Sequence, residues 1–502
     1  MIPRQLLAHA EARRVGAASR LDDKSRSALG QFFTPGRAAS LIAAIPRLPR
    51  EGQLRILDPG AGSGSLTAAI VARILSESPQ LDVEVVGVET DPTVAGYLRD
   101  TFEDCKDAAR SSGMSLDASV IEGDFIDLAT GLLASEPLLS RPFDLVIMNP
   151  PYLKLGARSS HRLAVAAIGA DCPNLYAAFL AVGVEVLRDG GQLAAITPRS
   201  FANGPYFGSF RRFLLDRLAL DAIHTFQSRS TVFADTGVLQ ENIVFSGTRV
   251  GKRSHVTIAI SAGHHDVAVV RTVPYNEVVR PGDPHKFVRV FANDKDQEAA
   301  DSMALIPCTL SGIGLSVSTG RVVDFRVRDL LRNEMDEATV PLVYPGNIRS
   351  GIVEWPREIR KPQALDVSDE VRAAKRVMPN GYYVLAKRFS AKEERRRIVA
   401  GVWDPTGHAA KTVAFENHLN VFHRSGAGLD RFLAIGLSYW LNSTLVDRFF
   451  RTFSGHTQVN ATDLRTLRFP SDDEMRALGA RFDPRLPDQD TLDEIVACHF
   501  EL

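Results

Sequence analysis

Residues 54–64 read LRILDPGAGSG, a short apolar strand that runs directly into a turn with three glycines. Residues 65–76 follow with apolar side chains at helical spacing. A strand, a glycine turn and a helix in this order are typical of the first unit of a nucleotide-binding α/β fold, where glycines let a ligand approach the backbone. Asp58, two residues before Gly60, favours a cationic group over a pyrophosphate, so we expect a ligand with a methionine-like ammonium.

Two later strands also end in carboxylates. Glu89 ends the apolar run 83–89, where it could hold a ribose diol, and a nicotinamide dinucleotide could use it equally well. A strand at about 118–122 leads to Asp124 and Phe125, which could accept from an adenine amino group and pack on the purine. The alternative makes Asp124 a helix N-cap and Phe125 a core residue. Carboxylates at three successive strand ends favour a binding site.

Residues 149–152 read NPPY and follow the buried strand 143–148. Two prolines stiffen the turn, so that the Asn149 amide oxygen and the neighbouring carbonyl become fixed acceptors for a planar substrate with an NH2 group. Tyr152 adds an aromatic face, and together these groups suit a flipped base. The alternative is a proline-rich turn that only caps a strand. A dehydrogenase does not need this turn, so the presence of the turn disfavours a nicotinamide cofactor.

In this order, the segments resemble the S-adenosylmethionine-dependent DNA adenine-N6 methyltransferases of the gamma, TaqI-type class of restriction–modification systems, over about residues 29–250. Residues 30–35, GQFFTP, stand where that family has a cofactor-contacting segment, and Thr34 would bond the cofactor's carboxylate. The resemblance implies a cofactor site of Thr34, Asp58, Gly60, Glu89, Asp124 and Phe125. It implies a target-base site of Asn149, Pro150, Tyr152 and Phe233. Phe233 would close over the base; alternatively it is a buried strand-end residue, with Phe226 or Phe245 in that role.

The fold expected is α/β, with a doubly wound, mostly parallel, seven-stranded methyltransferase sheet of Rossmann-like type. The strands are predicted near 54–58, 83–89, 118–122, 143–148, 192–197, 220–226 and 241–246. Residues 1–28 would form a helical extension, 29–270 the catalytic domain, and 271–502 a mixed α+β DNA-recognition domain. Within that last domain, the apolar periodic run 429–453 suits a packed helix.

Charge is segregated along the chain although the net charge is −1. Residues 341–470 carry 20 Lys and Arg against 12 Asp and Glu, and such a basic stretch predicts double-stranded DNA as a partner. The candidate phosphate contacts belong to a dense basic run of Lys387, Arg388, Lys392, Arg395, Arg396 and Arg397. His456, Gln458 and Asn460 could reach base edges. The alternatives are a solvated helix face for the run, and a turn with an N-cap at Thr462 for the polar loop.

The expected chemistry needs neither a metal nor a general base. An exocyclic adenine amine is a poor nucleophile, and acceptance of its hydrogens by the Asn149 side-chain oxygen and the Pro150 carbonyl would localise its lone pair for attack on the sulfonium methyl. Proton loss follows transfer, and S-adenosylhomocysteine is the product. The four cysteines have no zinc-site spacing.

We further expect a cytoplasmic monomer without a membrane span that works alongside a separate restriction endonuclease. Two rivals remain open. One is a methyltransferase that uses the same tetrapeptide on protein glutamine or on a guanine amine of ribosomal RNA. The other is a non-catalytic DNA-specificity component.

Overall fold

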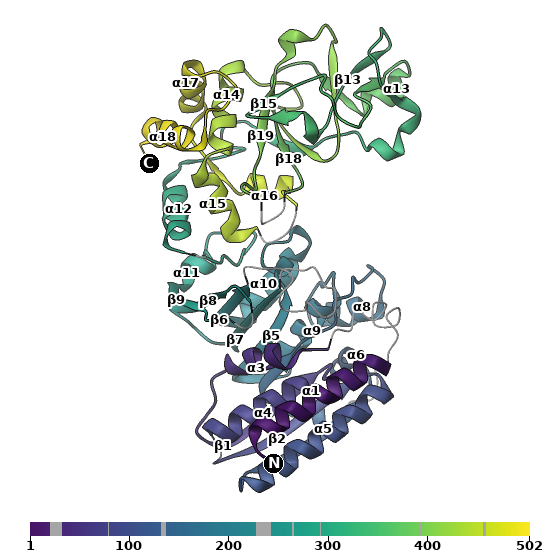
Figure 1. Ribbon diagram of the computed structural model, residues 1–502, viewed down its shortest axis with the longest axis vertical. Helices are drawn as coiled ribbons and strands as arrows, with labels where there is room; N and C mark the ends of the chain where they lie inside the picture. The colour runs from purple at the N-terminus through teal and green to yellow at the C-terminus, as the bar shows by residue number, and fades with distance from the viewer. Residues whose placement is uncertain are drawn as a thin grey trace. The chain divides into compact units, whose positions relative to one another are not determined.

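The chain folds into two compact units, Met1–Val290 and Phe291–Leu502, which are described separately (Figure 1). The computed structural model describes residues 1–20, 33–78, 80–131, 137–226, 242–263, 266–291, 293–390, 394–454 and 458–501. None of the helices in these ranges has the length and apolar character that a membrane crossing requires.

The first unit is built on a mostly parallel sheet. Within the described residues it has nine strands, in the order β3-β2-β1-β4-β5-β7-β6-β8-β9. Their bounds are β1 Glu51–Pro59, β2 Gln80–Glu89, β3 Ser115–Glu122, β4 Phe143–Met148, β5 Leu187–Pro198, β6 Leu218–Phe226, β7 Asn242–Arg249, β8 His255–Ser261 and β9 Val269–Pro274. The seven predicted strands are β1 to β7, so the methyltransferase-type α/β sheet is confirmed. Because β8 pairs in parallel with β6, the sheet extends to nine strands and the first unit continues beyond residue 270.

Helices cover this sheet. They are α1 Pro3–Arg20, α3 Gly36–Ala44, α4 Ser65–Glu77, α5 Pro92–Ser111, α6 Phe125–Thr130, α7 Pro137–Ser140, α8 Ser160–Ala167, α9 Leu175–Glu185, α10 Gly208–Arg217 and α11 Tyr275–Val278. Side-chain caps fix where several of them begin; Asp91, for example, accepts from the Thr93 and Val94 amides at 2.8 and 3.1 Å at the start of α5. The turn between β2 and α5 is therefore short and ends at a defined helix start.

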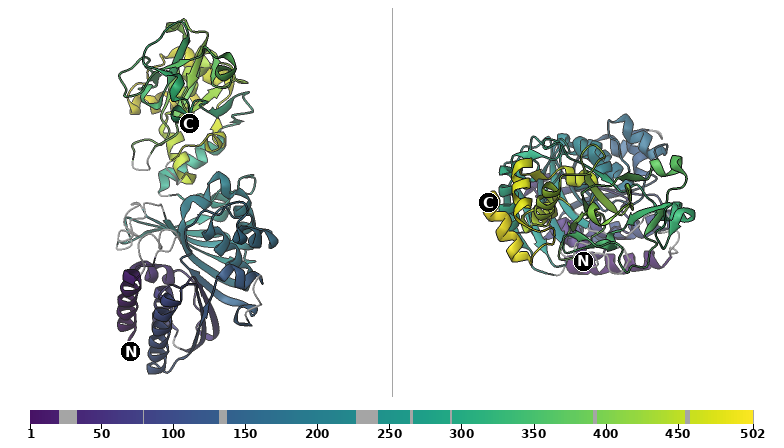
Figure 2. Two further views of the ribbon diagram at one scale, coloured as in Figure 1. Left: turned by 90° about the vertical axis from the view of Figure 1, so that its right-hand side faces the viewer. Right: turned by 90° about the horizontal axis from the view of Figure 1, so that it is seen from above.

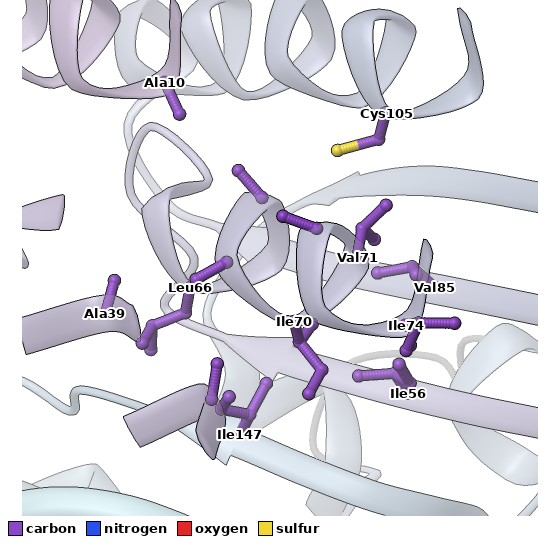
Figure 3. Packing of buried hydrophobic residues seen from close by; sticks show 14 of the residues in the cluster. Ala10, Ala39, Ile56, Leu66, Ile70, Val71, Ile74, Val85, Cys105 and Ile147 are labelled. Carbon is purple, nitrogen blue, oxygen red and sulfur yellow. The ribbon is translucent and has the colours of Figure 1, made fainter. Parts of the chain in front are cut away.

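The main core lies between the sheet and α4. Figure 3 shows side chains of α4, among them Ile70 and Ile74, between Ile56 of β1 and Cys105 of α5. Ala10 of α1 belongs to the same buried cluster. The predicted N-terminal helix thus packs on α4 and α5 as part of the first unit, and it is the purple helix in Figure 2.

The second unit combines sheets and helices. Its larger sheets have the orders β11-β21-β18-β19-β15-β14 and β12-β16-β13-β20-β17, and a small one pairs β10 with β22. The strands are β10 Cys308–Thr309, β11 Ser316–Thr319, β12 Leu331–Arg332, β13 Thr339–Val343, β14 Ile348–Arg349, β15 Ile352–Val353, β16 Ala364–Asp366, β17 Val377–Pro379, β18 Tyr383–Lys387, β19 Ala400–Trp403, β20 Thr412–Phe415, β21 Leu419–His423 and β22 Arg468–Phe469. The helices are α12 Asp294–Leu305, α13 Glu370–Ala374, α14 Arg431–Leu441, α15 Thr444–Phe453, α16 Ala461–Arg465, α17 Asp472–Arg481 and α18 Gln489–Phe500.

The apolar run 429–453 forms two helices, where the sequence predicts one. Ser443 ends the first by capping the second, because its hydroxyl accepts from the Val446 amide at 3.3 Å. Asn442 also turns its side-chain amide back to the Ser438 carbonyl at 2.7 Å. Polar side chains with local hydrogen bonds therefore break an otherwise continuous apolar pattern.

Candidate active site

A cavity of about 260 Å³ lies at the carboxyl edge of the first sheet. Its wall includes Gly60, Glu89, Asp124 and Asn149, which lie at or just beyond the ends of β1, β2, β3 and β4. Four neighbouring parallel strands thus bring together side chains that are far apart in the sequence, as expected where an α/β sheet binds a ligand.

The glycine turn after β1 is narrow and fixed. Gly60 and Gly62 have φ angles of +68° and +58°, a conformation that favours glycine. A Cβ on Gly62 would lie 3.2 Å from the Phe33 ring, and one on Gly60 would lie 3.3 Å from the Phe179 ring. The Gly62 amide donates to Glu89 Oε2 at 2.9 Å, so the turn and the end of β2 hold each other in place.

Glu89 is buried at the cavity wall. Its Oε1 accepts from the Asp91 amide at 3.0 Å, and burial raises its pKa. A carboxylate oxygen has more than one lone pair, so both oxygens of Glu89 can still accept from hydroxyl groups. This geometry is compatible with the ribose diol that the sequence analysis expects at Glu89.

Asp58 lies beneath the turn, outside the residues that line the cavity. It is fully buried, and the Thr67 hydroxyl donates to its Oδ2 at 2.8 Å. Among the described residues its Oδ1 has no hydrogen-bond partner, and burial raises its pKa to about 7. The hydroxyls of Ser63 and Ser65, which do line the cavity, are also buried without a described partner. Unpaired buried polar atoms are costly, so this end of the site is prepared for a polar ligand.

Asp124 and Phe125 fit both interpretations drawn from the sequence. Asp124 caps α6, since its Oδ1 accepts from the Ile126 and Asp127 amides at 2.9 and 3.1 Å, and it also lines the cavity. Phe125 is buried and lies 5.4 Å from Phe179, centroid to centroid, and both rings line the cavity. The helix cap leaves Asp124 Oδ2 for other partners.

Asn149 stands between two hydroxyl groups. Its Nδ2 donates to Thr34 Oγ1 at 3.0 Å, and the Tyr152 hydroxyl donates to Asn149 Oδ1 at 3.2 Å. Thr34 therefore lies at the cavity wall and also holds the predicted catalytic amide. Pro151 lines the cavity, whereas Pro150 is buried and is absent from the lining. The amide oxygen of Asn149 is thus held in a fixed direction at the cavity's edge.

Tyr152 belongs to a row of aromatic rings. It meets Tyr176 edge to face at 6.1 Å, and the Tyr176 hydroxyl lies 3.0 Å from Ser200 Oγ. Burial raises the pKa of Tyr152, so its phenol stays protonated and can donate to Asn149. Of the predicted residues, Phe233 and His456 lie outside the described residues, as do Gln31, Phe32 and Lys392. Phe226 and Phe245, the two alternatives to Phe233, are both buried.

The comparisons with known proteins agree with this geometry. Residues 103–233 match a family model described as Eco57I restriction-modification methylase. Over 486 residues the chain is 39% identical to the Type II methyltransferase M.PstI of Providencia stuartii, covering 96% of this chain and 95% of that protein. It is 41% identical over 463 residues to the Type II methyltransferase M.BsuBI of Bacillus subtilis, covering 91% and 90%. The chain belongs to the Type II methyltransferases.

This Type II methyltransferase also shares its fold with a solved structure. The Type IIL restriction-modification enzyme MmeI, in complex with DNA, matches 89% of this chain and 70% of its own with a TM-score of 0.55 and 12% identity. The predicted membership in the methyltransferases of restriction–modification systems is confirmed.

The second unit of the methyltransferase places several of the predicted DNA contacts together. The Val459 amide donates to the Arg388 carbonyl at 2.7 Å, and Phe389 pairs with Gln458, so the segment after β18 lies beside the polar loop. Lys387 ends β18, so the part of the basic run that is described here begins on a strand and not on a helix face. Arg395 is exposed and Arg396 is partly buried.

Two residues of this region have structural partners. Asn460, in place of the predicted Thr462, caps α16, and its Nδ2 donates to Asp463 Oδ2 at 3.3 Å. Arg397, counted in the basic run, is fully buried, where its Nε donates to Ser390 Oγ at 3.1 Å and its Nη1 to the Ser454 carbonyl at 3.3 Å. Arg397 is therefore a core residue, and the prediction that it belongs to the basic surface was wrong.

Several residues of the methyltransferase cavity were not singled out by the sequence analysis, among them His161 and Phe179. Phe179 lies on α9, whose first turn is capped by Asn174. Its apolar surroundings read as ordinary core, so periodicity alone could not single it out. His161 follows the NPPY segment but carries no recognisable spacing. Only the fold brings these side chains to the strand ends.

Proposed function

We propose that this methyltransferase transfers the methyl group of S-adenosylmethionine to N6 of an adenine in double-stranded DNA. The observation that carries the proposal is the Asn149 amide, fixed by Thr34 and Tyr152 at the edge of a cavity formed by four strand ends. An amide held in this way can recognise an NH2 group by geometry as well as by charge.

The residues of the cavity fit the proposed cofactor. When bound, S-adenosylmethionine supplies a methyl group on a positively charged sulfur. Glu89 would accept from the ribose hydroxyls and Asp124 Oδ2 from the adenine amine, while Phe125 and Phe179 would flank the purine. From beneath the glycine turn, outside the cavity lining, the Asp58 carboxylate would attract the ammonium end. Thr34, Ser63 and Ser65 would donate to the carboxylate.

The target amine would be activated without a general base. Asn149 Oδ1 would accept one of its hydrogens and concentrate the nitrogen lone pair. The Pro150 carbonyl, the second acceptor expected from the sequence, belongs to a buried residue outside the cavity lining and would have to become accessible when DNA binds. The nitrogen would then bond to the methyl carbon while the carbon–sulfur bond breaks and leaves its electron pair on the sulfur, and the surplus proton would leave the nitrogen afterwards to water. Asn149 Oδ1 already accepts from the Tyr152 hydroxyl. To accept from the target amine, this oxygen would either keep both hydrogen bonds or give up the one from Tyr152. Neither this step nor proton loss requires a metal ion.

The second unit would hold the DNA. Lys387, Arg388, Arg395 and Arg396 would contact phosphates, with Gln458 and Asn460 near base edges. The similarity to M.PstI supports this division, because it spans 96% of the chain and therefore includes the second unit. A methyltransferase for protein glutamine has no evident need for a unit of this size that contains the basic stretch 341–470. A non-catalytic role is disfavoured by the intact geometry of Glu89, Asp124 and Asn149. We further propose that the protein acts as a cytoplasmic monomer beside a separate endonuclease.

Expression in a host that lacks DNA methylation tests the proposal. Sequencing of the host DNA should reveal N6-methyladenine at one short recurring sequence. DNA that carries no modified adenine, while the purified protein still binds S-adenosylmethionine, would reject the proposed substrate and retain the cofactor.

A further inference from the structure

His161 lies at the cavity wall next to Asp124, and the proposed chemistry does not use it. Its Nε2 is 3.1 Å from Asp124 Oδ2, and each of the two side chains keeps about a quarter of its surface exposed. Asp127 lies close by: one carboxylate oxygen each of Asp124 and Asp127 and one ring nitrogen of His161 lie within 4.8 Å of one another. An imidazole that faces two carboxylates in a binding cavity suggests a role in that cavity.

The chain that follows NPPY fixes the position of His161. His161 lies in the first turn of α8, where the Ser159 hydroxyl caps the helix by accepting from the Arg162 amide at 3.3 Å. The connection before α8 is joined to the start of α9: the Leu175 amide donates to the Leu153 carbonyl at 2.7 Å, and the Leu155 amide to the Pro173 carbonyl at 2.9 Å. The target-base segment and the cofactor cavity therefore share one connected stretch of backbone.

The two oxygens of Asp124 have different partners. Oδ1 accepts the two amides that begin α6, so it cannot turn toward a ligand without uncapping the helix. Oδ2 is left to face the cavity, and an ionised carboxylate oxygen can accept two hydrogen bonds. If His161 donates one of them through Nε2–H, a single lone pair remains, and its direction is fixed.

We propose that His161 is a positioning residue of the cofactor site, which aims Asp124 Oδ2 at the 6-amino group of the cofactor's purine. This inference rests on the proposed function, because it takes an adenosyl cofactor in the cavity. A 6-oxo purine would turn a carbonyl toward the same oxygen, lose the hydrogen bond and meet repulsion. His161 therefore makes the site selective for aminopurine cofactors, an effect that acts through Asp124.

Calorimetric titration with two ligands tests the proposal: S-adenosylhomocysteine and its 6-oxo analogue, S-inosylhomocysteine. The wild type should prefer the amino ligand by about tenfold or more, because a hydrogen bond to a charged group is lost with the analogue. His161→Ala should lose most of this preference, and His161→Gln, which keeps a donor, should retain most of it. Arg162→Ala is the matched control on α8, where Arg162 pairs with Asp171 at the surface, and it should leave the preference unchanged.

Each outcome decides a separate question. If the wild type binds neither ligand, the proposed cofactor is wrong, and the role of His161 is rejected with it. If the wild type prefers the amino ligand and His161→Ala keeps the same ratio, His161 has no part in the selection and the cofactor proposal stands. An equal weakening of both ligands in His161→Ala and His161→Gln would show a merely structural residue. Thermal melts of each variant exclude misfolding as the cause.

Discussion

Asn149 combines a feature that the sequence contains with one that only the fold provides. The tetrapeptide at 149–152 predicts a rigid turn with a fixed acceptor, and the structure places that turn at the cavity. The hydrogen bond from Asn149 to Thr34 joins residues 115 positions apart. No local pattern encodes such a contact, and the same holds for His161 beside Asp124. Residues at strand ends were predictable because a parallel sheet brings its strand ends to one edge. The contacts between side chains of separate loops were not predictable.

The protonation of Asp58 gives a prediction at the same scale. Burial raises the pKa of Asp58 to about 7, so its carboxyl is largely neutral below that pH and ionised above it. Only the ionised form attracts an ammonium, so the affinity for S-adenosylmethionine should rise as pH increases through about 7, with release of a proton. Calorimetry at about pH 6 and about pH 8, in buffers of different ionisation enthalpy, measures both quantities.

Asp58→Asn supplies the control for this prediction. The folded pKa of Asp58 lies above its unfolded value of 3.8, so its contribution to stability is greatest below about pH 4 and is lost as pH rises through about 7. Asp58→Asn should remove this fall in folding stability with rising pH, and it should also remove most of the pH dependence of S-adenosylmethionine binding. Glu89, whose pKa burial also raises, leaves a smaller dependence. An unchanged pH profile in Asp58→Asn would contradict the assignment.

At the level of elements, α1 is joined to the cofactor segment by one side chain. Glu11 Oε2 accepts from the Gly36 amide at 3.0 Å where α3 begins, two residues after Thr34, and Arg14 donates to Glu11 Oε1 at 2.7 Å. Glu11→Ala should free the start of α3 and weaken S-adenosylmethionine binding several-fold, as for the loss of one charged hydrogen bond. His9→Ala, on the same helix but bonded to Asp104, is the control. Equal affinities of the wild type and Glu11→Ala in calorimetry would refute this link.

The close contact of α14 and α17 gives a stability prediction. A Cβ on Gly436 would overlap the Met475 carbonyl, and one on Gly479 would overlap the Phe432 carbonyl. The sequence predicts a helix here, but no pattern indicated that its glycine is a contact point for another helix. Gly436→Ala should therefore destabilise the second unit by about 1–3 kcal/mol in urea unfolding. Gly407→Ala meets no atom within 4 Å and should have little effect. Similar losses in both variants would contradict the packing argument.

At the scale of the whole molecule, the alternation of strands and helices was enough to predict the first sheet. The seven strands predicted for it are present: β1 to β5 pair in parallel, and β7 pairs antiparallel with β5 and β6. The end of the first unit was harder to predict, because a turn-rich sequence surrounds β8 and β9. The second unit has no simple alternation of strands and helices, so its sheets could not be ordered from sequence; the basic stretch 341–470 within it was the guide to its role.

That charge predicts how DNA binding depends on salt. The logarithm of the association constant should fall linearly with the logarithm of the salt concentration, because bound phosphates release counterions. Arg395→Gln should lower the slope by about one while affecting different DNA sequences alike. Arg110→Gln, an exposed arginine on α5 of the first unit, is the matched control. Fluorescence anisotropy at several salt concentrations gives both slopes, and an unaltered slope for Arg395→Gln would place the phosphates elsewhere.

The most direct test of the central claim is to locate the transferred methyl group. Purified protein is incubated with duplex DNA and S-adenosylmethionine carrying a deuterated methyl group, and the digested nucleosides are analysed by mass spectrometry. The account predicts label in N6-methyl-2′-deoxyadenosine from the DNA, reduced at least about a hundredfold in Asn149→Ala, with S-adenosylmethionine binding by that variant preserved. Label in a cytosine or in protein, or normal transfer by Asn149→Ala, would contradict it.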